Sequence, residues 1–361
     1  MKRTLNIALS VLSLAGIFAQ PLQAGLATPA GIFKKTIVAG KTQYLGTPFV
    51  RPEVSTGIIS SISGTQITVT PKNGDVTYTA GEYSGYTGAT SANEPYIIEI
   101  LDGDLIGYIG FISSCGATVN GSAVITVDVA PGAVTAGARY AIRPDWTVET
   151  LFGDATVSPI KGTTSKTKSS STTDQIQLIG GNGRVASTIF RKWTLSGNAP
   201  VPQIGAGFQW TSTAVVGDAK KLRIPYSSGI ILKAIAGANY DLTLAGDLRE
   251  ARLRKEILGF PRYNFVANPF AKDLPLKDTG IKITAGTSLA NADTLQIMNV
   301  ANGALVSYYL DSNGIWRDGD DEDASNVTIA KGTSFVIRRA SSRSTALTGA
   351  EAVKIDPVLV Y

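Results

Sequence analysis

The feature that most constrains the fold is a pattern of short β-like segments that occurs twice along the chain. Residues 43–49 (QYLGTPF) are similar to residues 264–270 (NFVANPF), and residues 174–179 (DQIQLI) are similar to residues 293–298 (DTLQIM). The segments are short and bounded by turn-forming residues, which favours strands over helices. The repetition predicts two related β-modules, with Phe49 and Phe270 in their two cores, and says little about chemistry.

Residues 1–27 have the features of a secretory signal peptide. Lys2 and Arg3 precede an apolar stretch from Ile7 to Phe18, and small residues follow, with Gly25-Leu26-Ala27 as the best cleavage site. The stretch is too short to span a bilayer, which needs about 20 apolar residues. We therefore expect a secreted protein, in the periplasm, on the outer surface or in the medium, with no transmembrane helix after the leader is removed.

The composition is typical of a secreted β-protein. Of 361 residues, 38 are Gly, 43% are hydrophobic and only 17% are charged, which favours sheets joined by many turns. This length allows two or three domains, each with its own core. The single cysteine, Cys115, excludes an intramolecular disulfide and is expected to be buried. The formal net charge of +5 does not indicate nucleic-acid binding.

Residues 28–157 form the predicted N-terminal β domain. Strand-like runs follow one another there at intervals of about ten residues, which is typical of a β-sandwich or a barrel. The runs are residues 56–70, with a turn at Ser63-Gly64, and residues 96–100, 106–112, 123–129 and 138–142.

Three further segments complete the predicted organisation. Residues 158–173 are rich in Ser, Thr and Lys and predict an exposed linker. Residues 174–262 are the first β-module and end in a charged stretch, residues 249–258 (REARLRKEIL), which predicts one short connecting helix. Residues 263–361 are the second β-module.

An alternative arrangement nests one unit inside another. In the second module Phe270 is soon followed by Asp273-Leu274-Pro275-Leu276, whereas the similar Asp145-Trp146-Thr147-Val148 lies far beyond Phe49. Residues 51–143 would then be an insertion into the first module, because domain insertions are tolerated in exposed loops. Both arrangements are compatible with the sequence.

Short structural motifs over most of the mature chain carry a family resemblance. They are Pro48-Phe49, Pro269-Phe270, residues 63–69 (SGTQITV), residues 146–152 (WTVETLF), Tyr308-Tyr309, Trp316-Arg317 and residues 335–338 (FVIR). With these motifs the chain resembles a paralogous family of uncharacterised secreted bacterial proteins with duplicated Pro-Phe, Trp-Arg and Phe-Val-Ile-Arg modules. The resemblance implies secretion and an all-β fold, and it supplies no catalytic residues. The acidic run at residues 318–323 departs from the family pattern.

The residue types exclude several chemistries. The chain contains no histidine, which removes Ser-His-Asp and Cys-His catalysis, and its single cysteine removes thiolate zinc and iron–sulfur sites. The Gly-rich residues 180–183 predict a hairpin turn rather than a phosphate-binding loop. We expect neither an enzyme nor a cofactor. The remaining catalytic alternative is a carboxylate-based hydrolase, with Glu99, Asp102 and Asp104 as candidate acids.

Two groups of residues are candidate binding sites. Asp318, Asp320, Asp321 and Asp323 offer oxygen ligands of the kind that calcium prefers, although their spacing does not fit an EF-hand. A solvated turn is the alternative for this run.

The second candidate is a tyrosine-rich loop. Tyr78, Tyr83 and Tyr86 lie among Gly, Thr and Ser residues, where exposed rings would stack against sugars or form an adhesive contact. By contrast, Tyr308-Tyr309 and Trp316 lie in strand-like runs and are expected to pack in a core.

The expected function is that of a non-catalytic secreted or cell-envelope structural or surface protein. The alternatives are a secreted module that binds a glycan or another surface ligand, a carboxylate hydrolase, and an outer-membrane barrel. Val353, Ile355, Leu359 and the terminal Tyr361 favour the outer-membrane barrel, whereas Pro357 disfavours it. Expected partners are a second copy, through unpaired strand edges, and a polysaccharide or cell-surface ligand, with no nucleic acid.

Overall fold

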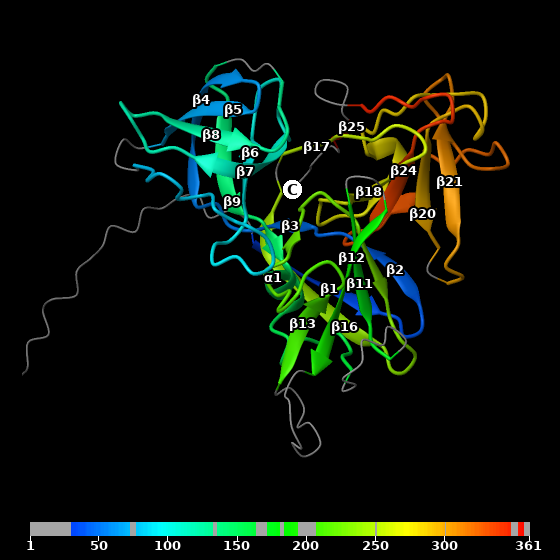
Figure 1. Ribbon diagram of the computed structural model, residues 1–361. Helices are drawn as coiled ribbons and strands as arrows, with labels where there is room; N and C mark the ends of the chain where they lie inside the picture. The colour runs from blue at the N-terminus through cyan, green and yellow to red at the C-terminus, as the bar shows by residue number, and fades with distance from the viewer. Residues whose placement is uncertain are drawn as a thin grey trace, which may run out of the picture.

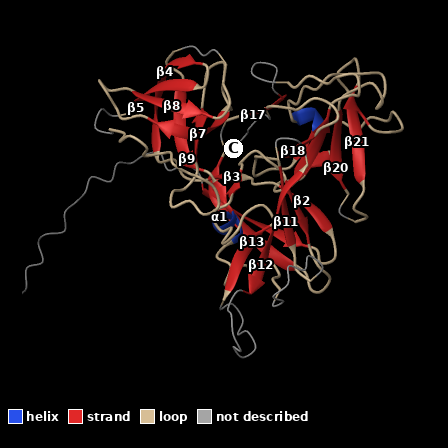
Figure 2. Cartoon of the chain, viewed as in Figure 1, coloured by secondary structure: helices blue, strands red, loops and turns tan. Residues whose placement is uncertain are grey.

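The computed structural model shows a protein built almost entirely of β-strands, as the sequence predicts. It describes residues 30–72, 77–132, 136–163, 172–180, 184–193, 207–249, 251–299, 301–347 and 353–356. Figure 1 shows three groups of strands: a barrel in blue to cyan, a sheet that is mainly green, and an orange sheet. Figure 2 shows how little of the chain is helical, and within the described residues no helix is long and apolar enough to cross a membrane. The expected leader lies outside the described residues.

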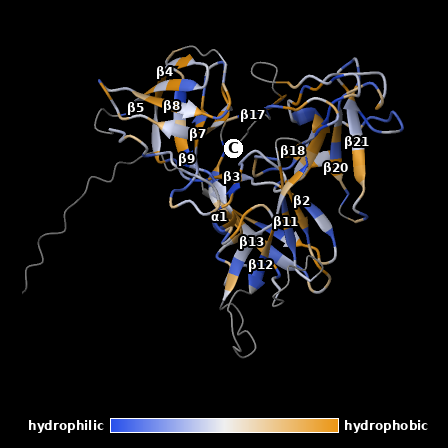
Figure 3. Cartoon of the chain, in the orientation of Figure 1, coloured by the Kyte–Doolittle hydropathy of each residue, from blue (hydrophilic) through white to orange (hydrophobic). Residues whose placement is uncertain are grey.

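The first group is a closed barrel of six antiparallel strands. The strands are β4 (Ser55–Ser63), β5 (Gln66–Pro71), β6 (Tyr96–Ile100), β7 (Ile109–Cys115), β8 (Ala123–Val127) and β9 (Arg139–Pro144). Their order around the barrel is β4-β5-β8-β7-β6-β9. Buried and exposed residues alternate along several of them, and Figure 3 shows the matching alternation of hydropathy. The interior contains Ile59, Ile67, Ile98 and Tyr140, and Cys115 is buried as expected.

Two five-stranded antiparallel sheets have the same strand order. The first contains β2 (Thr42–Leu45), β11 (Gln175–Ile179), β12 (Val185–Trp193), β13 (Phe208–Ser212) and β15 (Ile230–Lys233). The second contains β18 (Tyr263–Ala267), β20 (Thr294–Met298), β21 (Leu305–Leu310), β22 (Trp316–Arg317) and β24 (Ser334–Arg338). Their orders across the sheet are β13-β12-β11-β15-β2 and β22-β21-β20-β24-β18. When the strands of each sheet are ranked along the chain, the two orders are identical.

Smaller elements also occupy corresponding places beside the two sheets. The two-stranded ribbon of β10 (Trp146–Thr147) and β14 (Arg223–Ile224) accompanies the first sheet. The ribbon of β19 (Leu274–Pro275) and β23 (Thr328–Ile329) accompanies the second. A helical turn follows each ribbon's first strand: helix α1 (Val148–Phe152) and the 3-10 turn η1 (Leu276–Asp278).

A buried aspartate precedes the second strand of each sheet. Asp174 lies just before β11 and Asp293 just before β20, and neither is exposed to solvent. Each carboxylate accepts two backbone N–H groups from flanking loops: Lys161 (2.9 Å) and Ile235 (2.8 Å) for Asp174, Thr284 (3.1 Å) and Ala340 (2.9 Å) for Asp293. The two aspartates therefore fasten the loops at the same corner of both sheets, because buried backbone groups need hydrogen-bond partners.

A three-stranded sheet connects these groups. β16 (Tyr240–Leu248) pairs with β1 (Ala30–Ile37) along one edge and with the short β3 (Phe49–Val50) at one end of the other edge. All six barrel strands lie between β3 and β10 in the sequence. Strands from residues 30–50 therefore pair with strands from residues 230–248, as the nested arrangement requires.

The predicted connecting helix at residues 249–258 is wrong. The segment contains a short strand, β17 (Leu253–Lys255), which pairs with β25 (Val353–Ile355). The guanidinium of Arg249 donates to the carbonyl oxygen of Ala251 (2.8 Å), which a helix would need for its own hydrogen bonds. Contacts of buried arginine thus outweigh the local helical preference.

The predicted exposed linker at residues 158–173 is wrong for the part that the structure describes. Four of its residues are buried: Ser158, Ile160, Thr163 and Thr173. The hydroxyl of Thr173 donates to the carbonyl oxygen of Lys161 (2.7 Å), so a polar residue is buried with its hydrogen bond satisfied. Residues 164–171 lie outside the described residues.

Phe49 and Phe270 lie in two separate cores, which confirms their predicted burial. Phe49 packs in the core around the first sheet and Phe270 in the core of the second, and each is 2% exposed. The two sheets also contact each other through a small apolar cluster of Tyr44, Ile231 and Val336.

Replacing Phe270 with Ala should lower the free energy of unfolding by about 3–5 kcal/mol, because a large buried ring leaves a cavity behind. Urea denaturation followed by tryptophan fluorescence measures the loss. Val216→Ala is the control, since Val216 is 96% exposed and its truncation should change stability by less than about 0.5 kcal/mol. A near-neutral Phe270→Ala would contradict the packing described here.

Candidate functional site

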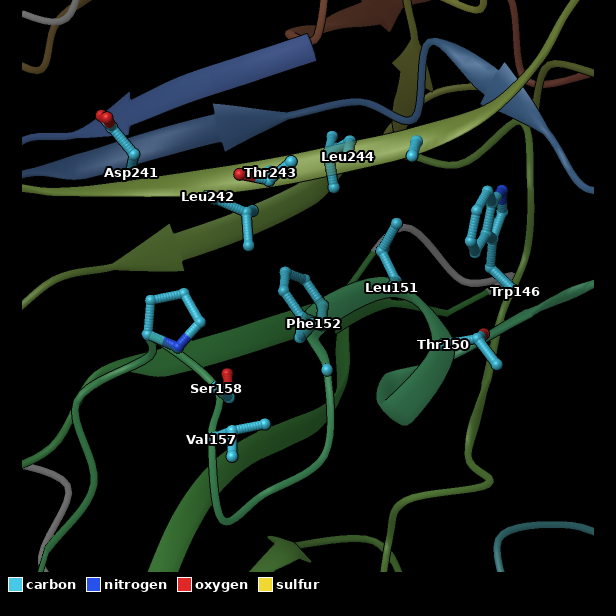
Figure 4. Close-up of a pocket in the computed structure, with 13 residues that line it drawn as sticks. Trp146, Thr150, Leu151, Phe152, Val157, Ser158, Asp241, Leu242, Thr243 and Leu244 are labelled. Carbon is cyan, nitrogen blue, oxygen red and sulfur yellow. The ribbon is translucent and has the colours of Figure 1, made fainter. Parts of the chain in front are cut away.

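A cavity of about 440 Å³ lies between β16 on one side and α1 with its following loop on the other. This volume is within the range of ligand pockets, about 300–1,000 Å³. Its lining comprises Trp146, Thr150, Leu151, Phe152, Gly153, Val157, Ser158, Pro159 and the consecutive residues 241–245. Figure 4 shows the cavity bounded by β16 and by the helix α1.

The cavity runs along an edge of β16 rather than over one of its faces. Side chains alternate between the two faces of a strand, so a cavity over one face would contact every second residue. Here all five residues from Asp241 to Ala245 line it. β1 covers the opposite edge from Tyr240 to Asp247, and β3 reaches only Asp247 and Leu248. Among the described residues, the edge that faces the cavity has no strand partner from Tyr240 to Gly246.

The cavity lining combines apolar and polar residues. Figure 4 shows Leu242 extending from β16 toward Phe152 of α1, whereas Asp241 points to the other side of the strand. Leu242 and Phe152 are buried members of the core around the first sheet. Thr150 and Thr243 add hydroxyl groups to the lining. An occupant would therefore meet an apolar floor and a backbone edge.

The wall opposite β16 is held by a buried arginine. Arg191 of β12 donates through Nε to the carbonyl oxygen of Ala155 (2.7 Å) and through Nη1 to that of Ser158 (2.6 Å) and to that of Ile160. Its guanidinium also lies 4.7 Å from the centre of the Phe208 ring. These contacts fix the loop after α1 in one position, so the cavity is preformed.

A buried network of charged side chains joins the barrel to the end of β16. Glu99 of β6 contacts Arg143 of β9 (Oε2–Nε 3.3 Å) and Arg249 (Oε1–Nη1 2.8 Å). Arg143 also contacts Asp247 of β16 (3.7 Å) and donates to the carbonyl oxygen of Arg51 (3.0 Å). These four charged side chains are buried. Since a buried charge is costly without partners, the network holds the barrel and β16 in one relative position.

A second polar contact reinforces this junction. Arg223 of β14 pairs with the buried carboxylate of Asp145 (2.6 Å), and its guanidinium lies 4.2 Å from the centre of the Phe111 ring in the barrel. Burial raises the pKa of Asp145 and outweighs the opposing effect of Arg223. The barrel is therefore joined to the rest of the molecule by charged and aromatic contacts.

The three predicted tyrosines do not form an exposed binding surface. Tyr78 and Tyr83 are only 2% and 7% exposed and belong to the barrel core. The hydroxyl of Tyr78 shares a hydrogen bond of 2.6 Å with that of Tyr140 across the barrel. Tyr86 is half-buried, and its hydroxyl donates to the carbonyl oxygen of Lys221 (2.9 Å). The expectation of stacking rings in this loop is therefore wrong.

The other aromatic residues lie where the sequence predicts. Tyr308, Tyr309 and Trp316 are buried, and Tyr308 and Trp316 belong to the core of the second sheet.

The acidic run Asp318, Asp320, Asp321 and Asp323 forms a hydrogen-bonded turn. The carboxylate of Asp318 accepts the backbone N–H groups of Asp320 (2.9 Å) and Glu322 (3.0 Å). Asp321 accepts the hydroxyl of Tyr309 (2.6 Å). Among the described residues, no three His, Cys, Asp or Glu side chains are placed to share a metal ion. These contacts favour the turn over the calcium site.

Two of the candidate acids of a hydrolase, Glu99 and Asp102, form ion pairs with different arginines. Glu99 is buried between two arginines, as described above. Asp102 pairs with Arg139 at the surface (2.6 Å), and hydrogen bonds from Arg139 lower its pKa although partial burial opposes this. Neither of them, nor Asp104, lines the cavity.

The cavity residues are hard to find from the sequence. Residues 240–248 (YDLTLAGDL) indicate a strand with Leu242 and Leu244 on one face, but not whether its edges are paired, because pairing depends on distant segments. One local signal exists: Arg51-Pro52 follows β3, and proline cannot donate to a strand ladder. Comparison of the chain with family models, curated proteins and solved structures finds no match.

Replacing Glu99 with Gln should lower the free energy of unfolding by about 3–5 kcal/mol, because it removes the carboxylate that pairs with buried Arg249 and one of the carboxylates that pair with buried Arg143. Asp102→Asn is the matched control. It breaks a contact with Arg139 in which both side chains are substantially exposed, which costs less than about 1 kcal/mol. Urea denaturation of both variants tests the difference, and equal losses would contradict the structural role of Glu99.

Lys255 should make the stability of the protein depend on pH. Its ammonium donates to the hydroxyls of Ser227 (3.0 Å) and Ser228 (3.3 Å). Burial, aided by the charge of Arg223, lowers the pKa of Lys255 to about 8. Since an unfolded lysine titrates near 10.4, the unfolded state binds more protons between these values, and stability rises with pH there.

The test compares wild type with Lys255→Met by urea denaturation at pH 7.5 and pH 9. The wild type should gain about 1 kcal/mol relative to the variant between these values. Buried tyrosines titrate alike in both proteins and cancel. A difference that does not change with pH would contradict the lowered pKa.

Proposed function

We propose that the protein is a non-catalytic secreted or cell-envelope protein with a structural or surface role. The observation that carries the proposal is the buried network around Glu99, which joins the barrel to β16. A network of this kind resists separation of the units that it connects, because pulling them apart leaves buried charges without partners. Rigid attachment of the barrel to β16 suits a component that bears load or presents a surface.

The state of the carboxylates supports a non-catalytic role. A carboxylate hydrolase needs two acids about 5–9.5 Å apart at its site. Asp241 is the one acidic residue in the cavity lining. It accepts the hydroxyl of Thr36 (2.9 Å) and lies 3.9 Å from Lys34. The cavity therefore offers surfaces for binding and no acid pair.

The matching architecture of the two sheets supports an internal duplication. Their strand orders agree, their accessory ribbons occupy corresponding places, and Asp174 and Asp293 fasten corresponding loops. We infer that the module containing residues 42–50 and 145–248 and the module containing residues 263–338 arose from one unit, with the barrel inserted into the first. Duplication enlarges a scaffold without adding chemistry.

A second candidate function is binding of a surface ligand, and the cavity beside β16 favours it. The cavity is large enough for a small ligand, combines an apolar floor with polar groups, and has a wall fixed by Arg191. The two functions are compatible, because a structural protein needs contacts with its neighbours.

Sedimentation velocity on the exported chain, residues 28–361, tests the structural role. Over a wide range of protein concentrations we expect growth into larger species, because a structural component must associate with itself or with a neighbour. Glu99→Gln is a useful comparison, since loosening the junction should broaden the distribution. A monomer at every concentration would contradict a self-assembling structural role.

A further inference from the structure

We propose that the cavity beside β16 is a docking slot for an extended peptide of another chain, which adds as a strand to the free edge of β16. The proposal rests on the ligand-binding function above and names the ligand class. The slot is the space between residues 241–245 and the loop after α1.

The backbone of β16 provides the first reason. An unpaired strand edge presents alternating N–H and C=O groups that another strand can bind, which is a recurring mode of peptide recognition. β16 is fully paired with β1 on one side, so its geometry is already that of a sheet strand. Among the described residues its other edge lacks a strand partner between Tyr240 and Gly246, next to the slot.

Continuity with β3 provides the second reason. β3 runs antiparallel to β16 on the same edge, with Phe49 opposite Leu248 and Val50 opposite Asp247. A longer β3 would place its next residues opposite Gly246 and then along the slot. Instead the chain turns away at Arg51, whose guanidinium binds Glu94 (2.9 Å). A docked peptide would occupy the line that β3 leaves vacant.

The dimensions of the slot favour a single segment over the edge of a folded sheet. Five strand residues span about 13 Å, at about 3.3 Å per residue, so the slot matches a peptide of about five residues. The loop after α1, which Arg191 holds in place, bounds the far side. A second sheet that approached this edge would meet the loop, so the arrangement favours a single extended segment.

The side chains of the slot define which peptide it would accept. Residues directly opposite each other on paired strands share a face of the sheet. Peptide residues opposite Leu242 and Leu244 would face the apolar core, and those opposite Thr243 would face solvent. The preferred peptide therefore alternates apolar and polar residues.

A sugar is a poorer fit to the same slot. Trp146 is the one indole in the lining, and it is only 7% exposed, which leaves little ring surface for stacking. Its indole N–H already donates to the carbonyl oxygen of Phe49 (3.2 Å). The polar groups that remain in regular array are those of the strand edge, and their spacing matches a peptide.

The experiment is fluorescence anisotropy with a labelled Thr-Val-Thr-Val-Thr peptide added to residues 28–361. We expect saturable binding, and at least tenfold weaker binding when the amide nitrogens of alternate peptide residues are methylated. Val157→Trp should also weaken binding at least tenfold, because Val157 lines the mouth of the slot and is 78% exposed. Val216→Trp is the matched control: Val216 is 96% exposed outside the slot, and binding should be unchanged.

Hydrogen exchange locates the contact. Amides of residues 240–246 should exchange more slowly when the peptide is bound, and those of the barrel should not change. Absence of saturable binding, or binding that methylation or Val157→Trp leaves unaltered, would overturn the inference.

A sugar probe separates this inference from the function on which it rests. If cellopentaose binds and Val157→Trp abolishes its binding while the peptide does not bind, the ligand-binding function stands and the peptide inference fails. If neither probe binds, both fail, and the sedimentation result alone decides the structural role.

Discussion

The junction between the barrel and the rest of the molecule depends on one buried carboxylate, Glu99. It lies on a barrel strand, but its partners Arg143 and Arg249 connect it to the end of β16 and to the segment before the second sheet. Removing the two carboxylates and two guanidinium groups of this network from water is unfavourable, and the loss is offset only when every charge has partners at once. The barrel, β16 and the connecting segment therefore have one mutual position in which this condition holds.

The free edge of β16 follows from the same junction. Entry into the barrel requires the chain to leave β16 after Val50, because Arg51 contacts Glu94 and its carbonyl oxygen accepts from Arg143. Pro52 then removes a donor that a longer β3 would need. β3 thus ends after two residues, whereas β16 is nine residues long. The unpaired edge therefore begins where the chain leaves β16 for the barrel.

Local patterns predict the parts of this protein that depend on neighbouring residues in the sequence. The strand-like runs at residues 56–70 and 96–100 predict strands of a sandwich or barrel, and the repeated Pro-Phe motif predicts two buried rings. Local patterns give wrong predictions where a residue contacts partners that are distant in the sequence. Tyr78 lies in a loop with an exposed composition, yet its hydroxyl meets Tyr140 across the barrel. Residues 249–258 have helical character, yet Arg249 is drawn to Glu99, which lies far away in the sequence.

Sequence patterns do not predict the cavity beside β16, because the cavity lies at a strand edge without a partner. The residues of a strand do not indicate which of its edges is paired. The structure also shows why this edge need not cause uncontrolled aggregation. Exposed strand edges promote aggregation when the edge of another sheet can pair with them. Here Arg191 holds a loop opposite β16 by donating to backbone carbonyl oxygens, so the loop needs no ligand to become ordered. Such a wall opposes the approach of a second sheet, and its preformed position would reduce the entropy lost when a single strand binds. Protection of the edge and selectivity for a single segment thus have the same physical origin.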